Sequence, residues 1–354
     1  MGRTEPILAP AEAIERIQFP RRWAADTALG RPRREPKPPI LTRPTLYKPR
    51  RLYQNYAQPR FAARSTSFAF AVRGVFLYFR PETLDEAVHV LAHTGGQILA
   101  GGTDFFPALG DRPVVGTVVD ISALRELRGV VTEPEHVKIG GLTTWTEVIN
   151  APLPRCFDGL KAAAREIGSI QIQNRATVAG NLCNASPAAD SVPPLLTLDA
   201  EVELASQAGT RRLPLRDFIV GNRKTVRQPG EILSQILVPR TVENASSIFL
   251  KLGARRYLVI SIAMVAAIIQ KDSRNRVTDA RVSVGSCSVV ARRLTNLERA
   301  LIGAPAVPGL GSLATADHLH DLSPIGDVRA TAAYRRDAAL RLVQRALDAC
   351  ARSS

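Results

Sequence analysis

The sequence predicts a mixed α+β fold preceded by a basic extension. Three observations lead to this prediction: helix-type and strand-type apolar patterns alternate along residues 75–354, no segment repeats at a fixed period, and most of the positive charge lies in the first 74 residues. With 354 residues, the chain has room for two or three domains with buried cores. No apolar run approaches the roughly 20 residues of a membrane-spanning helix, so we expect no membrane span.

The first 74 residues differ in composition from the rest. They hold 15 Lys and Arg against 5 Asp and Glu, whereas the remaining 280 residues hold 32 Lys and Arg against 27 Asp and Glu. They also hold 10 of the 25 prolines. Such a segment buries too little apolar surface to order itself, so we predict a disordered extension. Nucleic-acid or anionic-surface binding is one alternative, and a twin-arginine signal at residues 21–23 is another, although no apolar core follows it. We favour a dispensable tail or a start codon placed too far upstream, and we expect no nucleic-acid partner.

Short helices and strands are expected from residue 75 onward. Two capping boxes, Thr83 with Glu86 and Thr144 with Glu147, mark helix starts. The main expected helices lie at residues 84–94, 157–168 and 330–350. The expected strands lie at residues 76–79, 97–100, 116–122, 136–144, 200–205, 211–215 and 279–287, and residues 231–239, 246–256 and 258–270 are strands or a strand–helix mix.

A long stretch between these elements has neither periodicity. Residues 169–196 contain Val, Ile and Leu throughout, which argues against disorder. A loop of this length inside a compact domain is usually functional, so we predict an ordered functional loop. A seam between two domains is expected later, near residues 240–250.

The segment ILAGGTDFF at residues 98–106 ends a predicted strand in two adjacent glycines. Backbone amides without neighbouring Cβ atoms can form a nest that binds a phosphate or pyrophosphate. The segment is not a P-loop, because no Gly-Lys-Ser/Thr follows, and it is not a Rossmann motif. Alone, it is better explained as an ordinary turn between a strand and a loop.

A second segment, NRATVAGNLCNASPAAD at residues 174–190, is denser in polar and small residues. Small residues let a ligand lie close, amides and hydroxyls orient it, and a carboxylate can bind sugar hydroxyls. An Asn- and Ser-rich loop that satisfies its own backbone is the alternative. Two such segments, one suited to anions and one to hydroxyls, predict a long dinucleotide held between them.

The cysteines and histidines offer no metal or catalytic constellation. The four cysteines lie far apart, without a CxxC, so we expect no iron–sulfur cluster, structural zinc or disulfide framework in this chain, and a reducing cytoplasm as its compartment. His318 and His320, with Asp317 and Asp321, are interpreted as plain surface rather than a metal site. No catalytic acid–base pair is expected either.

These segments carry a resemblance to a known family. LAGGTD, IQNRATVAGNLCNASPAAD, LDAEV and FLKLGARR together resemble the FAD-binding medium subunits of the molybdenum hydroxylases, which include xanthine dehydrogenase, aldehyde oxidoreductase and carbon monoxide dehydrogenase. The resemblance covers about residues 75–350. It implies an FAD-binding fold of the vanillyl-alcohol-oxidase (PCMH) type with two subdomains at residues 75–242, followed by a small α+β domain at residues 243–354.

The resemblance also implies cofactor-binding roles for particular residues. The segment at residues 98–105 would wrap the FAD pyrophosphate, Asp190 would accept from a flavin-nucleotide hydroxyl, Leu233 would pack beside the isoalloxazine, and Lys251 would lie near the flavin. The full set implied is Ile98, Leu99, Ala100, Gly101, Gly102, Thr103, Asp104, Phe105, Gly168, Ile172, Ala176, Thr177, Gly180, Asn181, Asn184, Asp190, Leu233 and Lys251.

Two positions depart from the family pattern. Ala179 occupies the first glycine of the usual Thr-Val/Ile-Gly-Gly-Asn, which is tolerable if φ is negative and strained by about 1 kcal/mol if φ is positive. Phe105 and Phe106 replace the more usual aliphatic pair after GGTD, and they could crowd the ring without abolishing binding.

The function implied is electron transfer within a multi-subunit oxidoreductase. A molybdopterin subunit oxidises the organic substrate, [2Fe-2S] clusters on a small subunit relay electrons, and FAD on this chain delivers them to NAD, dioxygen or a quinone. A dimer of heterotrimers is the expected assembly. Two alternatives are kept: a stand-alone flavin oxidase of the same wider fold, and a non-enzymatic binding protein with a basic tail.

Overall fold

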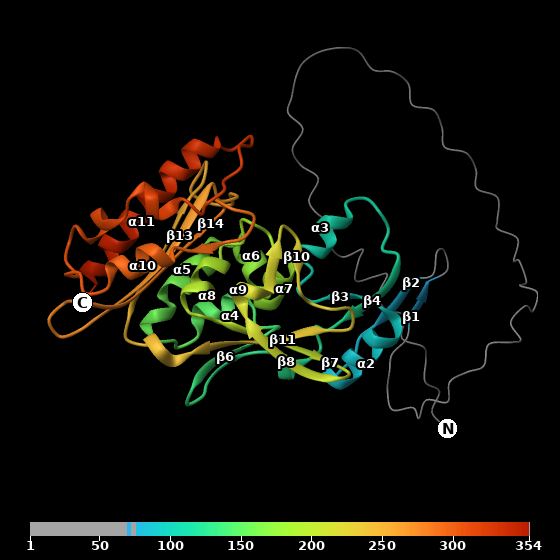
Figure 1. Cartoon of the computed structure of the whole chain (residues 1–354). Helices are drawn as coiled ribbons and strands as arrows, with labels where there is room; N and C mark the ends of the chain where they lie inside the picture. The colour runs from blue at the N-terminus through green and yellow to red at the C-terminus, as the bar shows by residue number, and fades with distance from the viewer. Residues whose placement is uncertain (1–68, 72–75, 354) are drawn as a thin grey trace, which may run out of the picture. The chain divides into compact units, whose positions relative to one another are not determined.

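The computed structural model describes residues 69–71 and 76–353 (Figure 1). The predicted extension, residues 1–74, lies outside the described residues except for the strand β1 (Ala69–Ala71). Apart from Ala69, the described residues belong to one compact unit, Phe70–Ser354. Within this part of the chain, no helix is both long enough and apolar enough to cross a membrane.

A four-stranded sheet with the order β1-β2-β4-β3 comes first along the chain. The strands β2 (Phe76–Phe79) and β3 (Gln97–Leu99) both pair in parallel with β4 (Gly116–Asp120). Parallel pairing places the carboxyl ends of β3 and β4 at the same edge of the sheet. The glycine pair that follows β3 therefore lies at that edge.

The helix α2 (Leu84–Thr94) joins β2 to β3 and packs on this sheet. Thr83 caps its first turn, because the Thr83 hydroxyl accepts a hydrogen bond from the Glu86 amide at 3.3 Å. Gly95 ends the helix in the left-handed conformation, with a φ of 62°. The apolar stripe expected from the sequence is buried at Ala87, Val88 and Leu91.

A five-stranded antiparallel sheet forms the middle of the described unit. Its strands, in spatial order, are β5 (Val130–Thr132), β6 (His136–Gly140), β11 (Ile232–Pro239), β7 (Glu201–Ser206) and β8 (Gly209–Pro214). Four helices accompany it: α4 (Trp145–Asn150), α5 (Asp158–Glu166), α7 (Val178–Asn184) and α8 (Val192–Thr197). The predicted hairpin is β7 and β8, and β11 pairs with both β6 and β7.

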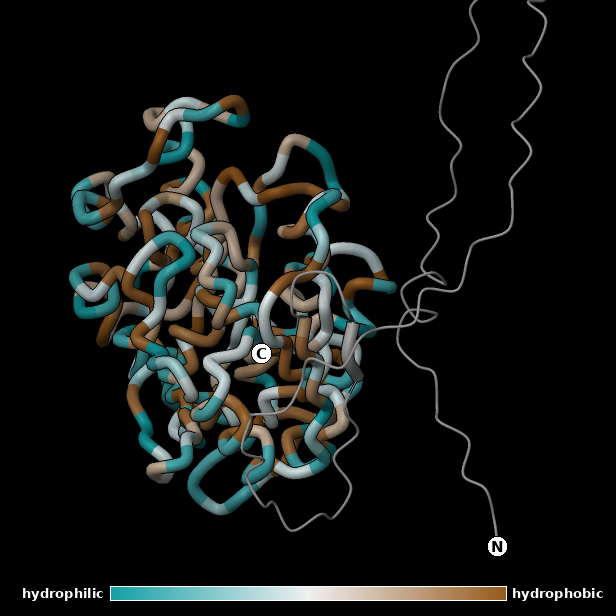
Figure 2. Tube along the Cα trace, turned by 90° about the vertical axis from the view of Figure 1, so that its right-hand side faces the viewer, coloured by the Kyte–Doolittle hydropathy of each residue, from teal (hydrophilic) through white to brown (hydrophobic). Residues whose placement is uncertain are grey.

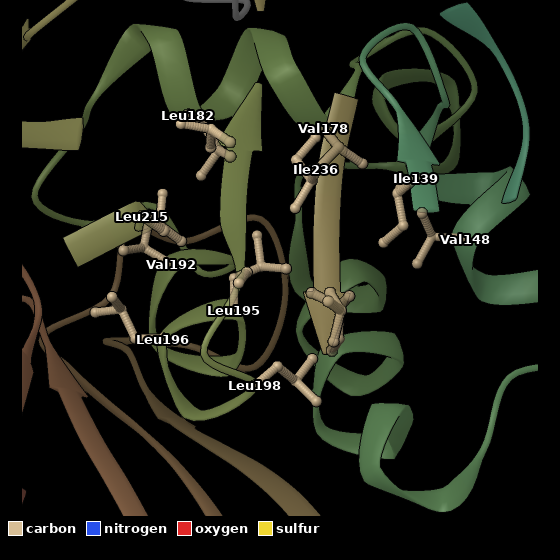
Figure 3. Close-up of a cluster of buried hydrophobic side chains, with 14 of the residues drawn as sticks. Ile139, Val148, Val178, Leu182, Val192, Leu195, Leu196, Leu198, Leu215 and Ile236 are labelled. Carbon is tan, nitrogen blue, oxygen red and sulfur yellow. The ribbon is translucent and has the colours of Figure 1, made fainter. Parts of the chain in front are cut away.

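The largest buried cluster lies between this sheet and its helices (Figure 3). Val178 and Leu182 from α7 and Leu195 from α8 point toward Ile236 of β11 and its neighbours. Each of these side chains is fully buried, and burying a Leu or Ile stabilises the fold by about 1.5–3 kcal/mol. The polar face of α7 is thereby left on the opposite side, away from the core.

A C-terminal layer completes the described chain. Its antiparallel sheet consists of β12 (Ser246–Leu252), β13 (Ala263–Lys271), β14 (Val277–Gly285) and β15 (Arg292–Arg293), in that order. The helices α10 (Thr295–Leu301) and α11 (Ala332–Arg352) pack on this sheet (Figure 1). Across the whole described unit, hydrophilic turns lie mainly at the outer edge of the molecule, and hydrophobic segments run through its interior (Figure 2).

The two larger layers meet where α5 packs against β12. The Gly159 amide donates to the Ser247 hydroxyl at 3.0 Å, and a Cβ on Gly159 would come within 2.6 Å of that oxygen. Ala163 of α5 packs with Phe249, Met264 and Ala266 in a small cluster of its own. Close helix–strand packing therefore joins the layers at this point.

The prediction of a loop without regular structure at residues 169–196 was wrong. The structure has α6 (Ile170–Gln173), α7 and α8 there. These helices are short, and α7 contains Gly and two Asn while α8 contains two prolines, which are poor helix formers in isolation. The elements not yet mentioned are α3 (Phe105–Leu109), α9 (Leu215–Phe218), β9 (Ile219–Gly221), β10 (Lys224–Thr225) and the 3₁₀ turns Arg125–Leu127, Arg155–Phe157, Arg240–Val242, Leu310–Leu313 and Ala316–Leu319.

Candidate functional site

The two segments singled out in the sequence lie against each other. A Cβ on Gly101 would come within 2.0 Å of the Arg175 carbonyl oxygen and 3.2 Å of the Ala176 Cα. No neighbour can yield at that distance, because both contacts are to backbone. Gly101 is therefore required so that the chain after β3 can pack onto the chain before α7.

A cavity of about 340 Å³ opens beside this contact. Its lining comes from the turn after β3, from α7 and from the start of β11. A second hollow, of about 410 Å³, adjoins it and shares five lining residues with it: Thr103, Asp104, Ala176, Asn181 and Asn184. The pair makes one extended groove, of the kind a long dinucleotide needs.

The structure gathers the predicted site residues in this groove, with two exceptions, Leu99 and Lys251. Those that line it are Ile98, Ala100, Gly101, Gly102, Thr103, Asp104, Phe105, Gly168, Ile172, Ala176, Thr177, Gly180, Asn181, Asn184, Asp190 and Leu233. Leu99 belongs to β3, where its carbonyl accepts from the Ile121 amide at 2.9 Å. Lys251 instead makes an ion pair with Asp190.

The amides of residues 101–103 suit an anion. Across the part of the chain that the structure describes, no protein group accepts a hydrogen bond from these three amides. Gly102 has a φ of 77°, and its bare face lies against the Phe106 ring, where a Cβ would come within 2.8 Å. Unpartnered backbone donors at a tight turn form the nest that binds phosphate groups. The residues present therefore fit the pyrophosphate of a dinucleotide.

The helix α7 is positioned by its own N-terminus. Thr177 caps it by accepting from the Gly180 amide at 3.1 Å, and the Ala179 amide donates to the Gly141 carbonyl at 3.2 Å. Ala179 lies in the helix and is not among the described residues with positive φ, so alanine at this position carries no backbone strain. The departure from the family pattern at Ala179 is thus compatible with the groove.

Asp190 is already bonded within the protein. Its carboxylate accepts from the Lys251 ammonium at 2.7 Å and from the Ser261 hydroxyl at 2.6 Å. Burial raises the pKa of the Asp190 carboxyl, while Lys251 and Ser261 oppose the rise. A contact between Asp190 and a flavin-nucleotide hydroxyl stays a prediction, and it would have to use the remaining lone pairs.

Several groove residues were not predicted from the sequence. They are Gln97, Ile121, Gly141, Leu142, Ala179, Cys183, Arg227 and Ile232 in the first hollow, and Glu166, Ile167, Ser186, Ala188, Ala189, Arg223, Leu258, Val259 and Ile260 in the second. The pair Gly140–Gly141, inside the strand predicted at residues 136–144, was an available signal, because it repeats the adjacent glycines of Gly101–Gly102. A Cβ on Gly141 would come within 2.3 Å of the Leu233 carbonyl. Within the described residues, no cluster of His, Cys, Asp and Glu is placed to hold a metal ion.

Comparison with known proteins decides the family. Residues 68–241 match the FAD binding domain in molybdopterin dehydrogenase, and residues 248–350 match the CO dehydrogenase flavoprotein C-terminal domain. The chain belongs to the FAD-binding subunits of the molybdenum hydroxylases. The resemblance noted in the sequence is thereby confirmed, as are the fold class, FAD as the cofactor of this chain and membership of an oxidoreductase.

Individual relatives agree with this assignment. The chain is 34% identical to the putative xanthine dehydrogenase FAD-binding subunit of Escherichia coli, covering 75% of this chain and 91% of that one. It is also 34% identical to the nicotinate dehydrogenase FAD-subunit of Eubacterium barkeri, and this match covers 65% of this chain and 80% of that one. A solved structure of carbon monoxide dehydrogenase from Hydrogenophaga pseudoflava has a TM-score of 0.71 at 27% identity, covering 77% of this FAD subunit and 96% of that chain.

Proposed function

We propose that this FAD subunit receives electrons from [2Fe-2S] clusters on a partner subunit and passes them through FAD to an external acceptor. The observation that carries the proposal is the row of unpartnered amides at residues 101–103, which line one cavity together with residues of α7 in a chain of this family. When bound, FAD supplies the reversible uptake and release of electrons. The chain itself supplies binding, orientation and electrostatics.

The chain's own residues divide this work among them. The amides of residues 101–103 donate to the pyrophosphate, and Asn181 and Asn184 orient the hydroxyl-bearing part of the cofactor. Ser191 donates to the Asn181 side-chain oxygen at 2.6 Å, which fixes that amide. Lys251 holds Asp190, which lines the second hollow, in an ion pair, so the carboxylate charge at that hollow is balanced.

The partners proposed are a small [2Fe-2S] subunit and a large molybdopterin subunit, assembled as a dimer of heterotrimers. NAD, dioxygen and a quinone are the candidate acceptors. The four cysteines are free in the structure, which favours a reducing compartment, and we propose the cytoplasm. A stand-alone flavin oxidase or a binding protein with a vestigial flavin site would lack these partners.

Co-purification tests the proposal directly. The full chain, expressed with its chromosomal neighbours, should be yellow with one FAD per chain and should elute with a cysteine-rich chain and a molybdopterin chain. Mixing the complex with its organic substrate under anaerobic conditions should bleach the flavin absorbance, while the isolated FAD subunit stays oxidised. A yellow chain that purifies alone and is reduced by a small substrate would instead indicate the oxidase.

The division into an extension at residues 1–74, an FAD-binding domain at residues 75–242 and a C-terminal domain at residues 243–354 is also proposed. Two truncations test its first boundary. Removing residues 1–66 should leave flavin content and thermal stability unchanged. Removing residues 1–74 also deletes β1, an edge strand of the first sheet, and should lower the unfolding temperature. Loss of flavin after the shorter truncation would show that the extension contributes to the fold.

A further inference from the structure

One cationic side chain lines the first hollow of the groove and has no role in the function described so far. Among the described residues that line this cavity, Arg227 is the single Lys or Arg, and Asp104 is the single carboxylate. The lining therefore offers no dedicated counter-ion beside Arg227. A guanidinium that lines the same cavity as the unpartnered amides of residues 101–103 is suited to an anionic ligand.

The loop that carries Arg227 is held in a fixed conformation. The Glu231 carboxylate accepts from the Gln228 amide at 2.6 Å and forms a two-point ion pair with Arg211, whose Nε and Nη2 lie 2.6 and 2.9 Å from its oxygens. Burial disfavours the Glu231 charge, but the hydrogen bonds from Arg211 and Gln228 outweigh it and lower the pKa of Glu231. The Glu231 carboxylate also feels the charge of Arg227, but its hydrogen bonds come from Arg211 and Gln228, so the Arg227 guanidinium forms no ion pair with it.

The Arg227 guanidinium is oriented by main-chain carbonyls through one of its nitrogens. Its Nη1 donates to the Glu231 carbonyl at 2.8 Å, and no other described residue except Gln228, whose carbonyl lies at 3.5 Å, accepts from the guanidinium. The Nε and Nη2 donors have no protein acceptor among the described residues. Arg227 also lies near α7, because its charge opposes the burial that raises the pKa of the Cys183 thiol to about 11.

We propose that Arg227 binds the diphosphate of FAD, opposite the amides of residues 101–103, and so makes the groove selective for FAD over flavins that lack the diphosphate. This inference rests on the proposed use of the groove as the FAD site. The fixed Nη1 bond orients the guanidinium, and Nε and Nη2 donate to phosphate oxygens, as planar guanidinium groups do. Backbone amides supply one side of the anion site and a cation supplies the other.

Flavin binding to the full chain, stripped of its cofactor, tests this inference. FAD, FMN, riboflavin and ADP are titrated into wild type, Arg227→Gln, Arg227→Lys and a control, Arg216→Gln, whose side chain is 70% exposed and lies outside this cavity. The expected result for Arg227→Gln is a loss of FAD and ADP affinity of about 10- to 100-fold, with riboflavin affinity unchanged. Arg227→Lys should lose less, and Arg216→Gln should match wild type.

The outcomes separate this inference from the proposed function. Equal FAD affinity in wild type and Arg227→Gln would overturn the role of Arg227 while leaving the FAD site intact. Equal losses for FAD and riboflavin would indicate a general packing role, and they would overturn the diphosphate contact. Failure of wild type itself to bind FAD would refute the proposed function. Riboflavin binding also reports whether each variant is folded.

Discussion

Gly101 illustrates how a glycine serves a binding site by its packing. The sequence suggested that the bare backbone at residues 101–102 leaves room for a ligand. The structure gives Gly101 another task, because the Arg175 carbonyl already occupies the space where its Cβ would lie. The sequence could predict that this position matters, but not which group comes close, since that group lies 74 residues further along the chain. Arg227 was missed for a related reason, because nothing local in its loop shows which cavity its side chain lines.

Replacing Gly101 with alanine should damage both the fold and the cofactor site. The added methyl would lie 2.0 Å from the Arg175 carbonyl oxygen, and relieving that overlap requires a backbone shift. We expect Gly101→Ala to lower the free energy of unfolding by about 1–3 kcal/mol and to empty the site of flavin. Gly326→Ala is the control, because its new methyl would find no atom closer than 3.7 Å. Flavin absorbance and urea unfolding measure both effects, and full flavin content in Gly101→Ala would contradict the packing argument.

Cys350 gives the chain a pH-dependent stability term. Burial raises the pKa of its thiol from 9.0 to about 12. Above pH 9 the unfolded thiol ionises while the folded thiol stays protonated, so stability falls by up to about 1.4 kcal/mol per pH unit. Cys350→Ala lacks this term. Its stability deficit relative to wild type should therefore shrink between pH 8 and pH 10.5 in urea unfolding under reducing conditions. A deficit that stays constant over this range would contradict the raised pKa of Cys350.

The helix α7 shows how tertiary contacts create an element that its sequence does not favour. Gly180, Asn181 and Asn184 all have weak helix propensity, so the segment had no helical signal. The helix forms because Thr177 caps it and because Val178 and Leu182 are buried in the main cluster. The longer amphipathic helices were predictable, since their apolar stripes and caps are local. The polar content that concealed α7 is the same content that identified the site.

Thr177 and Thr83 form a matched pair for testing α7. Each caps a helix by accepting from the amide three residues later, at 3.1 and 3.3 Å, but only Thr177 lines the groove. Thr177→Ala and Thr83→Ala should each destabilise the protein by about 1 kcal/mol. Only Thr177→Ala should also weaken FAD binding, by about tenfold, the equivalent of one hydrogen bond. Equal FAD affinity in the two variants would show that the α7 cap plays no part in the site.

At the scale of the described unit, the groove and the C-terminal layer are tied together by charge. Asp190 follows α7, whereas Lys251 belongs to β12 and Ser261 lies just before β13. The sequence placed Asp190 and Lys251 near the cofactor individually, and it could not show that they bond to each other. Leu258, Val259 and Ile260, which lie between Lys251 and Ser261 in the sequence, also line the second hollow. The groove and the seam between the layers therefore share residues.

A double-mutant cycle on Asp190 and Lys251 should show strong coupling. Their side chains are 8% and 7% exposed, and removing one partner leaves the other charge buried, at a cost of about 3–5 kcal/mol. The double variant Asp190→Asn with Lys251→Met buries no unpaired charge, so its loss of stability should be well below the sum of the two single losses. Lys138 and Glu133, an ion pair 39% and 43% exposed, provide the control cycle, with coupling below about 1 kcal/mol.

The pH dependence of Lys251→Met sharpens this test. Without the Lys251 ammonium, only the Ser261 hydroxyl opposes the burial that raises the pKa of Asp190. The folded variant therefore keeps the Asp190 carboxyl protonated at pH values above its ordinary pKa of 3.8, where the unfolded chain has already released this proton. Stability relative to wild type should therefore be lost as pH rises, so the deficit of Lys251→Met should be smaller at pH 5 than at pH 8. Urea unfolding at the two values measures it. Additive single losses together with a pH-independent deficit would mean that the two side chains act separately, and the seam would then depend on the packing of α5 and α8 against the C-terminal sheet.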